Sequence, residues 1–251
     1  MSALQGQTAV VTGGSKGIGL AIAHALAAAG ADVVLVARTR ADLDAAVAEV
    51  GAAATGAVSG LVADVSSAEG VGHLFGALRE STQGINIFVA NAGTGSYIPF
   101  LEISPAQWDE IVGLNLTGTF HCVQQAARMM LDREHANRVI LVVSSIRSDG
   151  ARPGVSAYAA TKAGINQLAR VAAYELAPHG VRVNVLSPGM TVTPLVLVNT
   201  PEVHEKAKAQ VPMGRPGLPE DMAAAAAYLC SPAAGFVTGT NLVVDGGEGL
   251  W

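Results

Sequence analysis

Seven short apolar runs alternate with longer helical patterns along this chain of 251 residues. The runs are rich in Val, Ile and Leu, which is typical of parallel strands buried on both faces. The alternation predicts βαβ units in an α/β fold, with a seven-stranded, doubly wound parallel sheet flanked by helices. The expected strands are 8–12, 32–36, 57–63, 85–90, 138–144, 181–187 and 241–245. The expected helices are 18–29, 40–50, 67–80, 106–131, 156–177 and 219–230.

Composition favours one folded domain over residues 1–251. Half of the residues are hydrophobic and 14% are charged, which supports a sizeable core and argues against disorder. No Pro-, Gly- or Ser-rich linker and no internal repeat divides the chain. The net charge of −5 argues against nucleic acid or an acidic membrane as a partner.

The sequence also indicates the compartment. Its first residues lack the pattern of a signal peptide, and no uncharged run is long enough to span a membrane. Cys122 and Cys230 lie in helical patterns without a C-x-x-C motif, so we expect buried thiols in a reducing, cytoplasmic setting. The six His residues show no metal-ligand spacing, so we expect no metal site.

A glycine-rich turn, "TGGSKGIG" (12–19), joins the first expected strand to the first expected helix. Glycine adopts positive φ without steric cost and lets a phosphate approach the backbone. The helix that follows points free N–H groups and its positive dipole end toward that phosphate. In the first βα turn of a Rossmann-type fold, this pattern predicts a dinucleotide site, whereas alone it would only indicate a turn.

The end of the second expected strand indicates which dinucleotide binds. An acidic residue there would hold the ribose hydroxyls of NAD(H), but this chain reads Ala37-Arg38-Thr39-Arg40. Arg38 can grip a 2′-phosphate with two hydrogen bonds, and Lys16 lies in the glycine loop nearby. We expect Arg40 to be solvated at the helix start. The sequence therefore favours NADP(H) over NAD(H).

A second constellation, "SSIRSDGARPGVSAYAATK", carries the chemistry. Tyr158 and Lys162 are four residues apart and share one helix face. Ser145 follows a strand, at the carboxyl edge where doubly wound folds bind ligands. A free Tyr has a pKa of about 10, and the lysine cation with an oxidised nicotinamide should lower it. Tyr158 would then exchange a proton with a carbonyl oxygen that Ser145 holds.

With these residues, the chain resembles the short-chain dehydrogenase/reductase family over nearly its whole length. The matching stretches are "TGGSKGIG", "ADV" (63–65), "NAG" (91–93), "LNLTG" (114–118), Ser145 with Tyr158 and Lys162, "SPGMTVT" (187–193), "PED" (219–221) and "VDGG" (244–247). The resemblance implies that Asn115 completes the catalytic set, supporting a proton-relay water near Lys162. It implies that Lys162 also holds the nicotinamide ribose.

The resemblance also implies which residues bind the cofactor. Asp64 and Val65 would flank the adenine, residues 91–93 would lie along the cofactor, and residues 188–193 would line its nicotinamide and phosphate side. The expected cofactor-binding set is Gly13, Ser15, Lys16, Gly17, Ile18, Gly19, Arg38, Asp64, Val65, Asn91, Ala92, Gly93, Tyr158, Lys162, Pro188, Gly189, Thr191 and Thr193.

The segment 194–212, "PLVLVNTPEVHEKAKAQVP", is expected to be a substrate lid. Its apolar start, with Leu195 and Leu197, suits a substrate with a hydrophobic body, and its helical part 202–210 is charged enough to move. The segment most resembles that of 3-oxoacyl-carrier-protein reductases, with sugar and polyol dehydrogenases second. We therefore expect an enzyme that acts on a small-molecule ketone or secondary alcohol.

Several alternatives remain open at this point. A dinucleotide-sensing protein without catalysis, or an interaction protein that uses the fold as a scaffold, would fit the glycine loop, although neither needs the proton relay. Arg147 and Arg152 either bind an acidic substrate group or lie in a solvated loop or subunit contact. Helices 106–131 and 156–177 resemble those that pair between subunits in the family, so we expect a homodimer or homotetramer.

Overall fold

A computed structural model describes residues 3–95, 97–132, 137–193 and 200–250. Its centre is one parallel sheet with the strand order β3-β2-β1-β4-β5-β6-β7. The strands are β1 (Thr8–Thr12), β2 (Asp32–Ala37), β3 (Val58–Val62), β4 (Ile87–Ala90), β5 (Arg138–Val143), β6 (Val181–Pro188) and β7 (Asn241–Val244). The seven-stranded, doubly wound Rossmann-type sheet expected from the sequence is confirmed.

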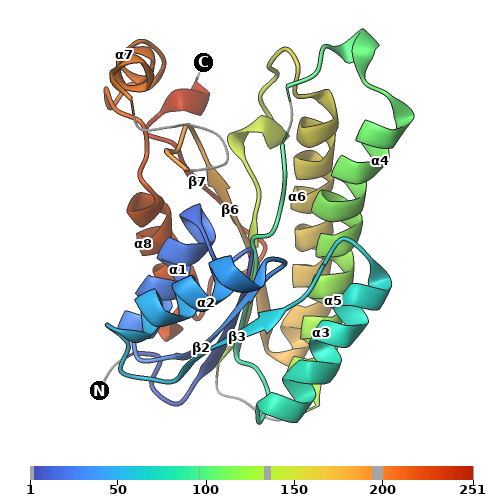
Figure 1. Ribbon diagram of the computed structural model, residues 1–251, viewed down its shortest axis with the longest axis vertical. Coiled ribbons are helices and arrows are strands. Elements are labelled where there is room, and N and C mark those ends of the chain that lie inside the picture. Colours follow the sequence, from blue (N-terminus) through green and yellow to red (C-terminus); the bar gives the residue numbers. More distant parts are fainter. Residues whose placement is uncertain (1–2, 96, 133–136, 194–199, 251) are drawn as a thin grey trace.

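Helices cover both faces of this sheet (Figure 1). One face carries α1 (Gly17–Ala28), α2 (Arg40–Gly51) and α8 (Pro219–Cys230). The other carries α3 (Ala68–Ser81), α5 (Thr119–Leu131) and α6 (Ser156–Leu176). The described helices also include α4 (Pro105–Val112) and α7 (Pro201–Gln210).

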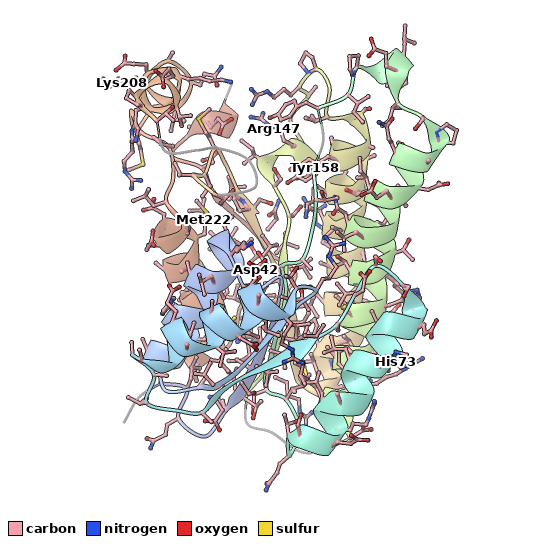
Figure 2. The ribbon with its side chains drawn as sticks, viewed as in Figure 1. Asp42, His73, Arg147, Tyr158, Lys208 and Met222 are labelled. Carbon is pink, nitrogen blue, oxygen red and sulfur yellow. The ribbon has the colours of Figure 1, made fainter. Side chains whose placement is uncertain are left out.

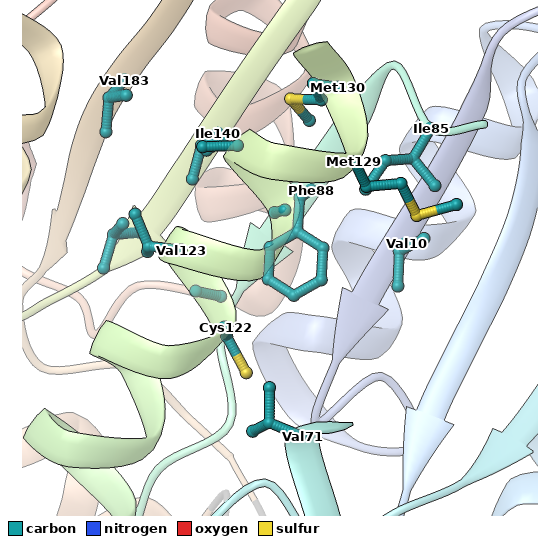
Figure 3. Packing of buried hydrophobic residues seen from close by; sticks show 14 of the residues in the cluster. Val10, Val71, Ile85, Phe88, Cys122, Val123, Met129, Met130, Ile140 and Val183 are labelled. Carbon is teal, nitrogen blue, oxygen red and sulfur yellow. The ribbon is translucent and has the colours of Figure 1, made fainter. Parts of the chain in front are cut away.

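The two faces hold separate hydrophobic cores because successive strand residues point to opposite sides. In β1, Val10 packs with α3 and α5, whereas Val11 packs with α1 and α8. Figure 3 shows the first core around Phe88 of β4, which is fully buried. The centroid of the Phe88 ring lies 5.5 Å from the centroid of the Phe75 ring. Cys122 and Cys230 are free and buried, as expected.

The expected helix 106–131 contains an irregularity that the sequence did not predict. A π-helical turn, Gly113–Gly118, separates α4 from α5. Within it, the side chain of Asn115 exchanges hydrogen bonds with the backbone of Thr94 across the molecule. A Cβ at Gly118 would lie 2.1 Å from the carbonyl oxygen of Val65, so only glycine fits there. In the parts of the chain that the structure describes, no helix is long and apolar enough to cross a membrane.

Candidate active site

A cavity of about 1030 Å³ opens at the carboxyl edge of the sheet. The strand order reverses between β1 and β4, and parallel folds bind ligands at such a switch point. Loops that follow β1 to β6 all contribute to its walls. Every residue of the expected cofactor-binding set lines this one cavity, and so does Ser145. Of the expected catalytic residues, Asn115 alone lies behind its wall.

The glycine loop has the geometry that a bound phosphate requires. Gly13 and Gly17 have φ of +62° and +57°, in the left-handed region that favours glycine. A Cβ at Gly19 would lie 2.3 Å from the carbonyl oxygen of Gly13, so α1 packs closely on the loop. The Asn91 amide donates hydrogen bonds to the carbonyls of Thr12 and Gly13 and fixes the loop. These features fit a dinucleotide pyrophosphate at the start of α1.

The adenosine end of the cavity contains a carboxylate that sequence reasoning missed. Lys16 Nζ lies 2.7 Å from the carboxylate of Asp42, in the first turn of α2. The positive charge of Lys16, which was expected to act with Arg38 on a phosphate, is thus paired with a carboxylate in the chain alone. Arg38 lines the same cavity and forms no ion pair within the described ranges. A turn in the chain brings Asp42 back to the glycine loop. The distance between Lys16 and Asp42 in the sequence therefore did not indicate that the two residues form an ion pair.

Ser145, Tyr158 and Lys162 all line the other end of the cavity. Figure 2 shows Tyr158 near Arg147, the second residue after Ser145. Ser145 follows β5, while Tyr158 and Lys162 lie one turn apart near the start of α6. Lys162 Nζ donates to the carbonyl of Val143 at 2.9 Å and lies 5.6 Å from the centroid of the Tyr158 ring. The N–H of Arg147 donates to Ser145 Oγ at 3.2 Å.

Burial is the largest influence on the pKa values of Tyr158 and Lys162. It raises the pKa of Tyr158, while a hydrogen bond from Ser145 and the charge of Arg147 lower it. Burial also lowers the pKa of Lys162 to about 8. In the chain alone the net direction for the Tyr158 pKa is upward, because the chain's own groups do not outweigh the loss of water around the phenolate. The lowering expected from the sequence also relied on the positive charge of an oxidised nicotinamide.

Asn115 supports this end of the cavity from behind. Its side chain is fully buried, and its amide donates to the Thr94 carbonyl at 2.8 Å and to Thr161 Oγ1 at 3.3 Å. A Cβ at Gly93 would lie 3.2 Å from Asn115 Oδ1 and 3.6 Å from Lys162 Nζ. Asn115 Oδ1 and Lys162 Nζ therefore both lie next to the same point beside Gly93.

Glu248 is a second carboxylate that sequence reasoning missed, and it is buried. It lies in the C-terminal turn, lines the cavity, and pairs with the guanidinium of Arg147. Its other oxygen accepts from the N–H of Met190 at 2.6 Å. Glu248 thus joins the turn after Ser145 to the loop after β6. The separation of 101 positions between Arg147 and Glu248 in the sequence explains why no sequence pattern revealed the pair.

The depressed pKa of Lys162 predicts a pH-dependent stability. The usual value is 10.5 and the folded value is about 8, so the folded state loses its proton first. Between pH 8 and 10.5 the unfolded chain binds more protons, and stability rises with pH by about 3 kcal/mol. Lys162→Met removes this rise. Urea unfolding at pH 7 to 10.5 measures it, and we expect the wild type to gain on the variant as pH increases.

Lys208→Met is the matched control, because Lys208 lies exposed on α7. This variant should keep the wild-type pH dependence. If the free energies of unfolding of the wild type and Lys162→Met differed by a constant amount over this pH range, the lowered pKa of the buried Lys162 would be contradicted.

Comparisons with known proteins agree with this geometry. A family model described as "Enoyl-(Acyl carrier protein) reductase" matches residues 13–248. The chain is 41% identical to 3beta-hydroxysteroid dehydrogenase 1 of Eggerthella lenta, covering 99% of this chain and 95% of that one. It is 37% identical to a 3-oxoacyl-[acyl-carrier-protein] reductase of Aquifex aeolicus, covering 97% and 98%.

A solved structure shows the same architecture. The Pseudomonas aeruginosa RhlG/NADP active-site complex superposes with a TM-score of 0.93 and 34% identity, over 98% of both chains. The chain therefore belongs to the short-chain dehydrogenase/reductase family, whose members use a nicotinamide cofactor, and it is an oxidoreductase that acts on an alcohol or carbonyl group.

Proposed function

We propose that this chain is an NADP(H)-dependent enzyme that interconverts a secondary alcohol and a ketone, including ketones of the 3-oxoacyl type. One observation carries the proposal: Ser145, Tyr158 and Lys162 line the same cavity as Arg38 and the glycine loop. The cavity thus combines a group that can exchange a proton with a site suited to a phosphorylated dinucleotide. Residues 1–251 act as one catalytic domain in this proposal.

The nicotinamide, when bound, supplies or accepts the hydride. In reduction, the Ser145 hydroxyl donates a hydrogen bond to the carbonyl oxygen and holds it beside Tyr158. Tyr158 gives its hydroxyl proton to that oxygen as negative charge develops there. The Lys162 cation stabilises the phenolate that remains. Asn115 holds the water through which the proton is replaced, and oxidation of an alcohol reverses each transfer.

The preference for NADP(H) rests on the charges around the adenosine end. Arg38 follows β2 without a paired carboxylate in the described chain, so its guanidinium is available to a 2′-phosphate. Asp42 opposes this preference, but its charge is engaged by Lys16. The solved relative in complex with NADP is consistent with the same choice.

Arg38→Ala should weaken NADPH binding roughly ten- to hundredfold, because a charged hydrogen bond contributes about 1.5–3 kcal/mol. NADH binding should change little. Asp42→Asn should strengthen NADPH binding, since it frees Lys16 and removes a negative charge. Fluorescence titration with both cofactors measures these affinities.

Arg40→Ala is the control for Arg38→Ala. Arg40 is exposed and lies 3.6 Å from Asp44 on the same helix, so its loss should affect neither cofactor strongly. Wild-type protein that binds NADH as tightly as NADPH would refute the preference.

Tyr158→Phe keeps the ring and removes the proton. It should lower kcat by roughly a hundred- to ten-thousandfold, while NADPH affinity stays near that of the wild type. A carbonyl panel followed at the nicotinamide absorbance measures the first effect, and the fluorescence titration measures the second. Near-normal turnover would show that another group donates the proton. A wild type that binds NADPH but turns over no carbonyl would favour the sensing alternative.

We also propose that segment 194–212 covers the substrate. Leu195 and Leu197 lie outside the described residues. In the described part, Lys206 of α7 lines the cavity, and Ala207 is the one buried side chain of that helix. A helix anchored by so little buried surface can shift at low cost. Hydrogen exchange of segment 194–212, measured with and without NADPH, tests whether this segment closes over the cavity.

A homo-oligomer is proposed on the outer face of α4, α5 and α6. Large apolar side chains are exposed there, and a contiguous patch of this kind commonly marks a protein interface. They are Trp108, Phe120, Leu131, Val171 and Tyr174. The double change of Val171 and Tyr174 to Glu should shift the protein toward monomer in sedimentation velocity, whereas Leu101→Glu, on exposed η1 (Phe100–Glu102), should not. A monomeric wild type at micromolar concentration would contradict this assembly.

A further inference from the structure

The catalytic end of the cavity carries more positive than negative charge. Arg147, Arg152 and Lys206 line it, from three different segments, in addition to Lys162. Among the described residues that line this end, Glu248 is the single carboxylate. Both of its oxygens are engaged, by Arg147 and by the N–H of Met190. The positive charge of Arg147 is therefore balanced inside the protein.

Arg152 differs from Arg147 in this respect. Within the described ranges it has no carboxylate partner. Arg152 is half-buried and lines the cavity, so its charge is only partly compensated by water.

The guanidinium of Arg152 is also held in place. It lies 5.6 Å from the centroid of the Tyr97 ring, a cation–π arrangement. The N–H of Ile98 donates to the carbonyl of Gly154 at 2.8 Å, which joins the loop of Tyr97 to the loop of Arg152. Gly154 has φ of +80°, and Tyr97 atoms lie 3.6–3.7 Å from the position a Cβ there would take. Stacking on a ring leaves the N–H edge of a guanidinium free to bind an anion.

The position of this cation relates it to the reaction. Tyr97 is close enough to Tyr158 to influence its pKa electrostatically. Arg152 contacts the same ring, so Tyr97 is a common neighbour of Arg152 and Tyr158 in the wall of one cavity. A substrate whose carbonyl oxygen contacts Tyr158 and Ser145 would lie along Tyr97 and place its other end near Arg152.

We propose that Arg152, held against Tyr97, binds an anionic oxygen group of the substrate, and that preferred substrates are oxo acids or hydroxy acids rather than neutral ketones or alcohols. This inference rests on the proposed function, since it names the substrate class for the same cavity. Arg147 does not share this role, because its guanidinium already forms an ion pair with Glu248. Lys206 adds positive charge to the same end of the cavity.

Paired substrates test the inference. We compare oxo acids of increasing length between ketone and carboxylate with their methyl esters, using NADPH. The wild type should favour the acid of matching length roughly tenfold in kcat/KM, as a partly exposed charged hydrogen bond allows. Arg152→Gln should remove this preference by raising KM for the acid while leaving kcat and the ester unchanged. Arg152→Lys should retain part of it, because the charge remains without the planar fork.

Further experiments distinguish a carboxylate from a phosphate as the bound anion and test whether charge is responsible for the preference. Phosphate monoesters of keto alcohols replace the acids in one arm, and preference for these would assign the site to a phosphate rather than a carboxylate. Added salt should lower kcat/KM for the acid and leave kcat/KM for the ester unchanged. Arg79→Gln makes the same charge change on the exposed end of α3, away from the cavity, and should alter nothing.

Two kinetic outcomes would overturn the inference. One is equal wild-type kcat/KM for acids and esters of every length, and the other is an Arg152→Gln variant that loses activity equally on both. Calorimetric binding of a hydroxy acid to the NADP-loaded protein provides a readout that needs no turnover, and binding unaffected by Arg152→Gln would also overturn it. Failure of the proposed function looks different, since neutral ketones would then also remain unreduced.

Discussion

The parallel direction of all seven strands is the constraint on which the rest of this molecule depends. Each strand ends at the same edge of the sheet, so loops far apart in sequence open into one cavity. A polar link holds the two central loops together: the hydroxyl of Thr12 accepts hydrogen bonds from the N–H groups of Asn91 and Ala92. The glycine loop and the loop after β4 are thereby fixed as one wall, and the buried cores beneath them hold this edge rigid.

Charges in the cavity follow a common pattern at its two ends. Each end has one cation neutralised by a carboxylate, Lys16 by Asp42 and Arg147 by Glu248. Each end also has one arginine without an ion pair in the described chain, Arg38 and Arg152. A paired cation contributes to local structure, whereas an unpaired one lowers the cost of bringing an anion into a partly buried space. The distinction between paired and unpaired charge is what gives these four cations different roles.

The sequence predicted the parts that depend on local chemistry. Apolar runs identified all seven strands to within two residues at each end, and the spacing of glycines predicted the turn that Gly13 and Gly17 form. Every residue expected to bind the cofactor lines the cavity. These features depend on backbone conformation and on periodic burial, which neighbouring residues determine.

Features that depend on distant contacts escaped the sequence. The pairing of Lys16 with Asp42 and of Arg147 with Glu248 needs the folded path of the chain. The direction of the Tyr158 pKa depends on burial, which a helical spacing to Lys162 does not reveal. The π-helical turn was hidden for a similar reason, since its stability comes from Asn115 binding the backbone of Thr94 rather than from helix propensity.

That π-helical turn also determines the phase of the helix that follows it. One residue corresponds to about 100° of rotation in an α-helix, so removing a single residue from Gly113–Gly118 would turn the buried face of α5 away from the sheet. That face includes Cys122, Val123 and Ala126. The interval that places the Asn115 amide against Thr94 and Thr161 therefore also keeps the core in register. A change of length there would disturb catalysis and packing together, so the residue count of this segment is constrained from two sides.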